Sequence, residues 1–252
     1  MLKRLMTRII RAAGLQFVRH TGQFDISPKR LRRLREMGVD FKMAIDGGAA
    51  SGVWAEELKR VFPKAQVLCV EPRANAQGAL GEVAKRLNGI HVARVLLGDK
   101  EGNVTFHEQE DQSSIMPPSQ GNPLGVLKQE RMTTLDLLVK KMELPDPDLI
   151  KLDLQGAELL CLKGAPRCLA SAQFVIIEIS LISIYDNSPV LADVVDFMNA
   201  NGFRVYDILS LWHRPLDGTT TFGDFLFIKS GHEFVLDPRW SKRVKWDRSL
   251  FR

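Results

Sequence analysis

Acidic residues stand at the ends of five short apolar segments of the chain. They are Asp46, Glu71, Asp99, Asp153 and Glu178. In an open parallel β-sheet, ligands bind beyond the carboxyl ends of the strands, so acids in these places would gather at one site. Carboxylates there can accept hydrogen bonds from ligand hydroxyls, attract a cation or take a proton. Capping of a helix or turn is the alternative for each acid alone, but it explains the ordered set less well.

A glycine-rich turn follows the first of these acids. Its residues that could lie against a ligand are Gly47, Gly48, Ala50 and Gly52. A turn of this kind between a strand and a helix lets a ligand approach free backbone N–H groups, and both dinucleotide and nucleoside sites use it. Asp46 favours S-adenosylmethionine, because it would attract the sulfonium and ammonium groups and repel a pyrophosphate. Glu71 then suits the two ribose hydroxyls, and Asp99 the adenine amino group.

The elements that must position these residues alternate along the chain. Strands predicted from apolar runs cover residues 43–46, 67–70, 90–97, 104–107, 149–154, 174–179, 203–208 and 225–228. Amphipathic periodicity predicts helices between most of them. This alternation is typical of a doubly wound α/β fold with a mostly parallel sheet, and the last two strands could pair antiparallel at its edge. We predict one α/β domain over residues 43–230, a basic helical appendage over 1–42 and a basic aromatic tail over 231–252.

Several motifs, in order, resemble the FkbM family of S-adenosylmethionine-dependent methyltransferases, which has the Rossmann-like class I methyltransferase fold. Residues 44–52 resemble the first class I motif, and Val70-Glu71-Pro72 resembles the second. The later motifs that resemble the family are residues 98–106, 133–136, 150–158, 162–165 and 177–179. The resemblance spans about residues 30–229 and implies an O-methyltransferase with Pro72 and the glycine turn among its cofactor contacts.

The chain departs from the family pattern at two positions. The family usually has Asn where Ala50 stands, so one polar contact to the amino-acid end of the cofactor would be missing. Ala50 still permits a tight turn if its φ is negative. Gln155 stands where the family usually has Glu. We interpret the first departure as a question of cofactor affinity.

The resemblance also implies that the fourth-strand motif lies beside the transferred methyl group. Methyl transfer needs alignment of an acceptor oxygen and removal of its proton. Asp153 is therefore the first candidate for orienting or deprotonating an acceptor hydroxyl, followed by Glu178 and then His107. The alternatives are a helix cap for Asp153, a contact with Lys151 or a turn for Glu178, and a solvated edge-strand residue for His107.

Candidate contacts for the acceptor lie in two further segments. The polar segment 109–125 has the length of a lid or binding loop, and a surface excursion is its alternative. It contains Ser113 and Ser114, and the family has a Ser-Ser element in a similar place. Tyr185 and Trp212, with polar neighbours, offer the aromatic surface that a sugar needs. The resemblance implies an acceptor in a polysaccharide, glycolipid or glycosylated metabolite.

The composition excludes several classes of protein. Of the 252 residues, 45% are hydrophobic and 26% are charged, which argues against a disordered, collagen-like or coiled-coil chain. No apolar run reaches the roughly 18 residues of a membrane span, and we recognise no secretory signal. The three cysteines lack zinc-site spacing. We therefore predict a cytoplasmic protein without a structural metal, and whether a metal assists catalysis stays open.

Positive charge is concentrated at the N-terminus. The chain carries +5 in total, whereas residues 1–42 carry +8, so the rest is slightly acidic and nucleic acid is disfavoured as a partner. Residues 2–13 predict a short amphipathic helix with a cationic face. This helix could contact an anionic membrane surface or pack on the body of the protein.

Two alternatives to a sugar O-methyltransferase remain at this stage. One is a catalytically silent module that uses the fold to bind a membrane surface or a partner. The other is an NAD(P)-dependent oxidoreductase, which Asp46 and the absence of an intact G-x-G-x-x-G motif disfavour. Binding of an adenosyl ligand, a nicotinamide ligand or neither distinguishes the three.

Overall fold

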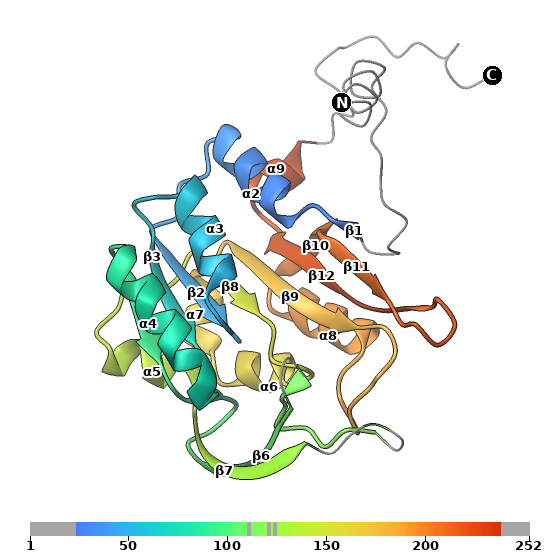
Figure 1. Ribbon diagram of the computed structural model, residues 1–252. Coiled ribbons are helices and arrows are strands. Elements are labelled where there is room, and N and C mark those ends of the chain that lie inside the picture. The colour runs from blue at the N-terminus through green and yellow to red at the C-terminus, as the bar shows by residue number, and fades with distance from the viewer. Residues whose placement is uncertain (1–23, 110–111, 120–121, 123–124, 238–252) are drawn as a thin grey trace, which may run out of the picture.

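The computed structural model describes residues 24–109, 112–119, 122 and 125–237. Its centre is a nine-stranded β-sheet with helices on both faces (Figure 1). From one edge the strands run β4 (Ile90–Ala93), β3 (Gln66–Val70), β2 (Met43–Gly47), β8 (Leu149–Leu152), β9 (Phe174–Ser180) and β12 (Thr220–Lys229). β12 also pairs with β10 (Phe203–Ile208) and β11 (Ser210–His213), and β11 pairs with β1 (Phe24–Asp25).

The five neighbouring strands β4, β3, β2, β8 and β9 are parallel to one another, and β12 is antiparallel to β9. The predicted doubly wound, mostly parallel sheet is therefore confirmed. β10 and β12, the last two predicted strands, do pair antiparallel, but β12 lies inside the sheet rather than at its edge. The chain builds outward from β2 to β4 and then returns to β8 on the other side of β2. Ligands of open α/β sheets bind at such a reversal of strand order.

Two apolar clusters hold the helices to the two faces of the sheet. On one face pack α2 (Ser27–Glu36), α3 (Val53–Val61) and α4 (Gln77–Arg86), with α9 (Glu233–Leu236) beside them. On the other face pack α5 (Leu135–Lys141), α6 (Glu158–Lys163), α7 (Pro166–Ser171) and α8 (Leu191–Ala200). A single 3₁₀ turn, η1 (Ala74–Ala76), precedes α4. Successive residues of β2, β3 and β8 point alternately into the two clusters, so both faces of each strand are buried. This explains why these strands are almost wholly apolar.

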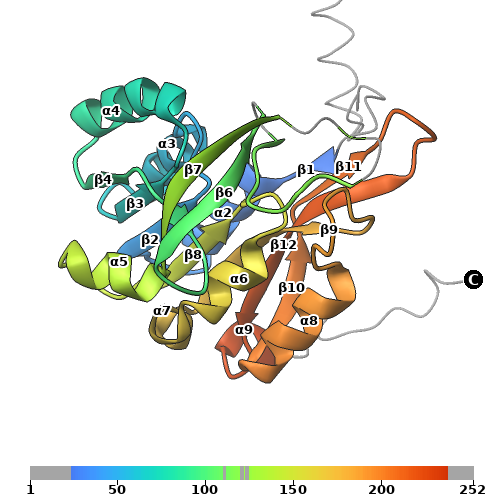
Figure 2. The same cartoon turned by 90° about the horizontal axis from the view of Figure 1, so that it is seen from below.

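A separate three-stranded sheet lies at the end of the main sheet. It consists of β5 (Leu96–Leu97), β7 (Val126–Thr133) and β6 (Gly102–Glu108), and in Figure 2 β6 and β7 lie beside α6. The single strand predicted over residues 90–97 is therefore wrong. Residues 90–93 belong to the main sheet as β4, and Leu96–Leu97 pair with β7 instead. β7 itself was not predicted, because its middle is polar and lacks an apolar run.

The N-terminal segment is described only from residue 24. Leu31 and Leu34 of α2 are 2% and 1% exposed and join the same cluster as α3, so residues 24–42 pack on the α/β domain. The helix expected over residues 2–13 and the tail from residue 238 lie outside the described residues, and membrane contact there stays a prediction. Within the described ranges, every helix is too short or too polar to cross a bilayer.

Candidate active site

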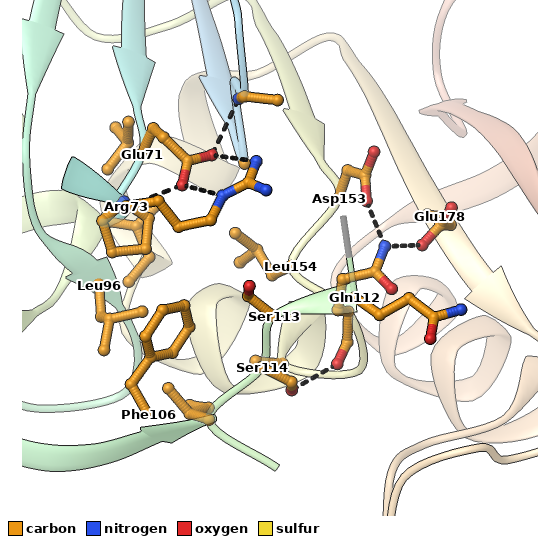
Figure 3. A pocket seen from close by; sticks show the side chains of 18 of the residues that line it. Glu71, Arg73, Leu96, Phe106, Gln112, Ser113, Ser114, Asp153, Leu154 and Glu178 are labelled. Atoms are coloured by element: carbon orange, nitrogen blue, oxygen red, sulfur yellow. Dashed lines mark hydrogen bonds and ion pairs between the residues drawn. The ribbon is translucent and has the colours of Figure 1, made fainter. Parts of the chain in front are cut away.

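A pocket of about 450 Å³ lies where the strand order reverses, at the carboxyl ends of β2, β3 and β8 (Figure 3). Residues of the small sheet and of the segment 112–115 also contribute to its lining. The sequence-predicted residues that line it are Gly48, Ala50, Glu71, Pro72, Ser113, Ser114, Asp153 and Glu178. The structure therefore brings the acids that follow β3 and β8 and the acid near the end of β9 to one cavity, as the strand-end argument predicts.

Other predicted residues lie outside this lining, namely Asp46, Gly47, Gly52, Asp99, His107 and Tyr185. Asp99 is exposed to solvent, because the strand before it belongs to the small sheet rather than to the main one. Asp99 is therefore not part of the pocket wall, and its contact with adenine stays a prediction. His107 lies on β6, where its backbone pairs with that of Ser114, and its side chain does not reach the cavity.

The glycine turn after β2 approaches β8 very closely. A Cβ on Gly48 would lie 1.9 Å from the carbonyl oxygen of Asp153, and the φ of Gly48 is +78°, so only glycine fits. Ala50 has a φ of +47°. The condition of a negative φ at Ala50 is therefore not met, and this alanine adopts the left-handed conformation that costs a non-glycine residue about 1–2 kcal/mol. The absence of an Asn side chain here thus has a conformational effect as well as a polar one.

Asp46 lies behind this turn and is completely buried. Its nearest cation is Lys151, whose Nζ is 3.5 Å from Oδ1, and neither carboxylate oxygen has a hydrogen bond within the described part of the chain. Burial raises the pKa of Asp46, and the charge of Lys151 opposes that rise. Asp46 therefore does not line the cavity, and its attraction to a cationic cofactor stays a prediction.

Glu71 is held firmly at the wall of the pocket. Its Oε2 accepts a hydrogen bond from the backbone N–H of Ala50 at 2.9 Å, and Oε1 accepts one from the backbone N–H of Arg73 at 3.0 Å. The guanidinium of Arg73 adds a bond from Nε to Oε1 at 2.9 Å. Figure 3 shows this carboxylate joining the glycine turn to the start of η1. Arg73 was not among the predicted site residues, although it directly follows the Glu-Pro motif.

The wall near Glu71 is apolar. Its residues are Val70, Pro72, Val95, Leu96, Leu97, Phe106 and Ile115. Phe106 of β6 and Leu96 of β5 are 2% and 6% exposed and belong to the small apolar cluster of the three-stranded sheet. The small sheet therefore supplies the flat apolar surface that a nucleobase needs. Sequence analysis missed this wall because it assigned residues 90–97 to one strand.

Gln155 connects the two leading catalytic candidates. Its amide Nε2 donates to Asp153 Oδ1 at 2.9 Å and to Glu178 Oε2 at 2.8 Å, and its Oε1 accepts from the Tyr185 hydroxyl at 3.0 Å. Burial, followed by the charge of Asp153, raises the pKa of Glu178 well above its usual range. Lys151 Nζ lies 3.4 Å from Asp153 Oδ2. The Gln that replaces the family's Glu thus places two N–H donors between two carboxylates.

The described part of the long loop, residues 112–119, is hydrogen-bonded to β6, to Gln155 and to residues 184–186. Ser114 is 1% exposed, its backbone exchanges hydrogen bonds with His107 of β6, and its hydroxyl donates to the Gln155 carbonyl oxygen at 2.6 Å. Further along, the N–H of Ser119 donates to Ile184 and that of Asp186 donates to Pro117. Residues 112–115 therefore form a wall of the cavity, and residues 116–119 continue as a segment bonded to residues 184–186, which favours the binding-loop interpretation over a surface excursion.

Asp224 of β12 also lines the pocket, as do Trp212 and Phe222. Sequence analysis named Trp212 as an aromatic surface but missed Asp224, because the predicted last strand began one residue later. Burial raises the pKa of Asp224, and the hydroxyl of Ser210 opposes that rise by donating to Oδ2 at 2.6 Å. The signal available in the sequence was an acid inside an otherwise aromatic and apolar segment, residues 222–228.

Comparison with known proteins agrees with this geometry. A family model described as the methyltransferase FkbM domain matches residues 46–205, which is more than half of the chain. The chain belongs to this family. The FkbM resemblance and the class I methyltransferase fold that the sequence predicted are therefore confirmed.

Relatives of this FkbM methyltransferase include two curated proteins and one solved structure. The 2-O-methyltransferase NoeI of Sinorhizobium fredii is 25% identical over 191 residues, which cover 69% of this chain and 76% of NoeI. The hexuronic acid methyltransferase AglP of Haloferax volcanii is 31% identical over 46% of this chain and 48% of AglP. A crystal structure of methyltransferase FkbM from Methylobacillus flagellatus KT has a TM-score of 0.50 at 22% identity and shares the fold. The match covers 75% of this chain and 43% of that one.

As an FkbM methyltransferase, the chain uses S-adenosylmethionine as its methyl donor, and the residues present fit this cofactor. The apolar wall and the carboxylate of Glu71 suit an adenosine, and the free N–H groups of the glycine turn suit a carboxylate. Asp153 and Glu178 line the other half of the same pocket, where a carboxylate would attract a sulfonium. The guanidinium of Arg73 already donates to the carboxylate of Glu71. Ribose hydroxyls would therefore have to displace that guanidinium or share the carboxylate with it.

Proposed function

We propose that this FkbM methyltransferase transfers a methyl group to a hydroxyl of a sugar in a polysaccharide, glycolipid or glycosylated metabolite. The observation that carries this is one pocket with two unlike halves. One half is apolar and carries Glu71, and the other holds Asp153, Glu178 and the amide of Gln155 between them. The names of the two curated relatives, one a 2-O-methyltransferase and one a hexuronic acid methyltransferase, support an acceptor of this class.

Glu178 is the better proton acceptor of the two acids in this arrangement. Burial raises its pKa, and a base works best when its pKa lies near the working pH. The carboxylate of Asp153 is held between Lys151 Nζ, 3.4 Å from Oδ2, and the amide of Gln155, which suits Asp153 to orienting the hydroxyl. The geometry therefore favours Glu178 for proton removal, although sequence analysis placed Asp153 first.

The bound cofactor supplies an electrophilic methyl group on a positively charged sulfur. The acceptor hydroxyl would be the nucleophile toward that methyl group, with Asp153 orienting the hydroxyl and Glu178 accepting its proton. Gln155 fixes the carboxylate of Glu178 in one orientation through Oε2, and Ser114 holds the backbone of Gln155. Residues 112–115 add a further wall to the pocket.

Ligand binding tests the cofactor half of the proposal. Calorimetric titration with S-adenosylmethionine, S-adenosylhomocysteine and NADH should give heat with the two adenosyl ligands alone. Glu71→Ala should weaken that binding at least tenfold, because a carboxylate that receives two hydroxyls is lost. Glu82→Ala is the control, since this acid forms an exposed ion pair with Lys85 outside the pocket, and the variant should bind normally. Binding of neither adenosyl ligand by folded protein would favour the silent module.

Methyl transfer tests the acceptor half. Labelled S-adenosylmethionine is incubated with the full chain and a panel of methyl glycosides, and label in the glycoside is measured. Glu178→Gln should reduce kcat by about 100-fold or more while S-adenosylhomocysteine binds normally, because a general base contributes about 10²–10⁴ to the rate. An unchanged kcat in this variant would contradict the role of Glu178.

A further inference from the structure

Asp224 stands directly beside the proposed base. β12 pairs with β9 in antiparallel register, and Asp224 lies opposite Glu178 in that register. Side chains of such a pair project from the same face of the sheet, with Cβ atoms about 4.5–5.5 Å apart. Both residues line the pocket. Two carboxylates therefore enter the acceptor half of the cavity side by side.

One oxygen of each carboxylate is already engaged. Ser210 donates its hydroxyl to Asp224 Oδ2 at 2.6 Å and accepts the backbone N–H of Asp224 at 2.9 Å. Gln155 donates to Glu178 Oε2 at 2.8 Å. Within the described residues, Asp224 Oδ1 and Glu178 Oε1 receive no hydrogen bond from the protein. These two oxygens are neighbouring acceptors in the same cavity. Each carboxylate is oriented by the hydrogen bond to its other oxygen, Asp224 Oδ2 or Glu178 Oε2.

Keeping two acids opposite each other is unfavourable for the fold. Like charges at directly opposed positions destabilise a sheet, and both residues are half-buried. The nearby cation, Lys151, makes its ion pairs with Asp46 and Asp153. Groups kept in such a place are candidates for a functional role. A ligand that donates two hydrogen bonds would relieve the unfavourable arrangement.

An aromatic wall adjoins the two oxygens. Trp212 of β11 pairs with Phe222 of β12, their ring centroids are 6.0 Å apart, their planes differ by 19°, and both side chains line the pocket. Aromatic faces pack against the C–H face of a sugar ring, while carboxylates accept its hydroxyls. Phe222 lies two residues before Asp224 on the same face of β12. The wall and the acids therefore belong to one surface.

We propose that Asp224 determines acceptor specificity by receiving the hydroxyl adjacent to the one that is methylated. Glu178 accepts a hydrogen bond from the reacting hydroxyl, Asp224 Oδ1 accepts one from the adjacent hydroxyl, and Trp212 packs against the sugar ring. The acceptor then presents a vicinal pair of hydroxyls to this end of the pocket. This inference rests on the proposed sugar acceptor.

The same arrangement selects against negative charge. Asp153, Glu178 and Asp224 face the cavity, and the buried cation Lys151 is shared with Asp46. A glycosiduronate whose carboxylate lies near Asp224 would meet like charge in a partly desolvated site. Neutral hexosides and amino sugars would not. The structure therefore assigns this chain a neutral or amino-bearing acceptor.

The test compares matched acceptors and matched variants of the full chain. The probes are a neutral methyl hexopyranoside that accepts label, its monodeoxy analogues and the corresponding methyl glycosiduronate. The variants are Asp224→Ala, which removes the acceptor oxygens, and Asp224→Asn, which keeps an oxygen and removes the charge. Asp217→Asn is the control, because Asp217 pairs with Arg214 in the exposed β11–β12 connection outside the pocket. Binding of S-adenosylhomocysteine shows that each variant is folded.

The inference predicts two changes in kcat/KM. In the wild type, loss of the adjacent hydroxyl should lower kcat/KM by roughly 10- to 100-fold, and Asp224→Ala should abolish that difference. The neutral glycoside should exceed the glycosiduronate by at least about tenfold, and Asp224→Asn should bring that ratio towards one. Asp217→Asn should leave both ratios unchanged.

Three results would overturn the inference. The first is a wild type that uses the glycosiduronate as well as the neutral glycoside. The second is an Asp224→Asn or Asp224→Ala variant that keeps both wild-type ratios. The third is an adenosyl-binding protein that methylates no glycoside, neutral or charged, which refutes the proposed sugar acceptor itself and is recognised by the absence of any rate to compare.

Discussion

The guanidinium of Arg73 occupies the carboxylate of Glu71, with Nε 2.9 Å from Oε1 and Nη2 3.4 Å from Oε2. The carboxylate also accepts hydrogen bonds from the backbone N–H groups of Ala50 and Arg73. Each of its two oxygens therefore already has two N–H donors. A ribose must therefore compete with Arg73 for Glu71. The side chains of this pair are only 11% and 4% exposed, so the competing contact is not merely a solvated surface pair.

Arg73→Ala should tighten the binding of S-adenosylhomocysteine by several-fold. The variant removes the competing donor and leaves the two backbone bonds that hold Glu71 in place. Calorimetric titration at low and high salt measures the effect, and the difference from wild type should shrink as salt screens the ion pair. Weaker binding by Arg73→Ala would mean that the guanidinium contacts the ligand itself.

Gly48→Ala should destabilise the protein by roughly 3 kcal/mol or more. Its Cβ would overlap the Asp153 carbonyl oxygen, which belongs to the backbone and cannot move without displacing β8. Gly81→Ala in α4 is the matched control, because a Cβ there meets no atom within 4 Å and alanine favours the helix by about 0.5–1 kcal/mol. Urea unfolding of both variants should give changes of opposite sign.

Ala50→Gly should stabilise the protein by roughly 0.5–1 kcal/mol. Glycine relieves the strain of a φ of +47°, and this gain exceeds the extra freedom of glycine in the unfolded chain. The neighbouring Ala49→Gly is the comparison, since Ala49 is not among the residues with positive φ and should lose stability. A loss of stability in Ala50→Gly, measured by urea unfolding, would show that residue 50 is not strained.

Stability should fall as pH rises between about 4.5 and 7, in part because of Glu158. Burial raises the pKa of this carboxyl from 4.5 to about 7, although the N–H groups of Leu154 and Gly156 stabilise its charged form. In that range the folded protein keeps a proton that the unfolded chain releases, so the free energy of unfolding decreases by up to about 3 kcal/mol.

Glu158→Gln removes this titration and keeps an oxygen for the two N–H groups. Its free energy of unfolding, relative to wild type, should rise as the pH is raised from 4 to 8. Urea unfolding at several pH values measures the difference, and other titrating groups cancel because both proteins contain them. A difference that does not change with pH would contradict the raised pKa of Glu158.

Much of the fold could be predicted because the central strands are buried on both faces. β2, β3, β8 and β9 read as apolar runs, and the acids that follow or end them mark the ligand edge. Two features depended on pairing between distant segments. The break between β4 and β5 is invisible in a continuous apolar run, and the approach of Asp224 to Glu178 depends on which strand pairs with β9. Local patterns carry neither kind of information.

The interior position of β12 also affects how the protein is synthesised. β9 has one neighbour, β8, until residues 220–229 have left the ribosome, and its other edge then presents unpaired backbone groups flanked by buried isoleucines. The nascent chain must keep that edge from pairing with other chains while some forty residues are added. Premature termination within this stretch would leave an open apolar edge, so truncated products are expected to aggregate and to become substrates for chaperones and proteases.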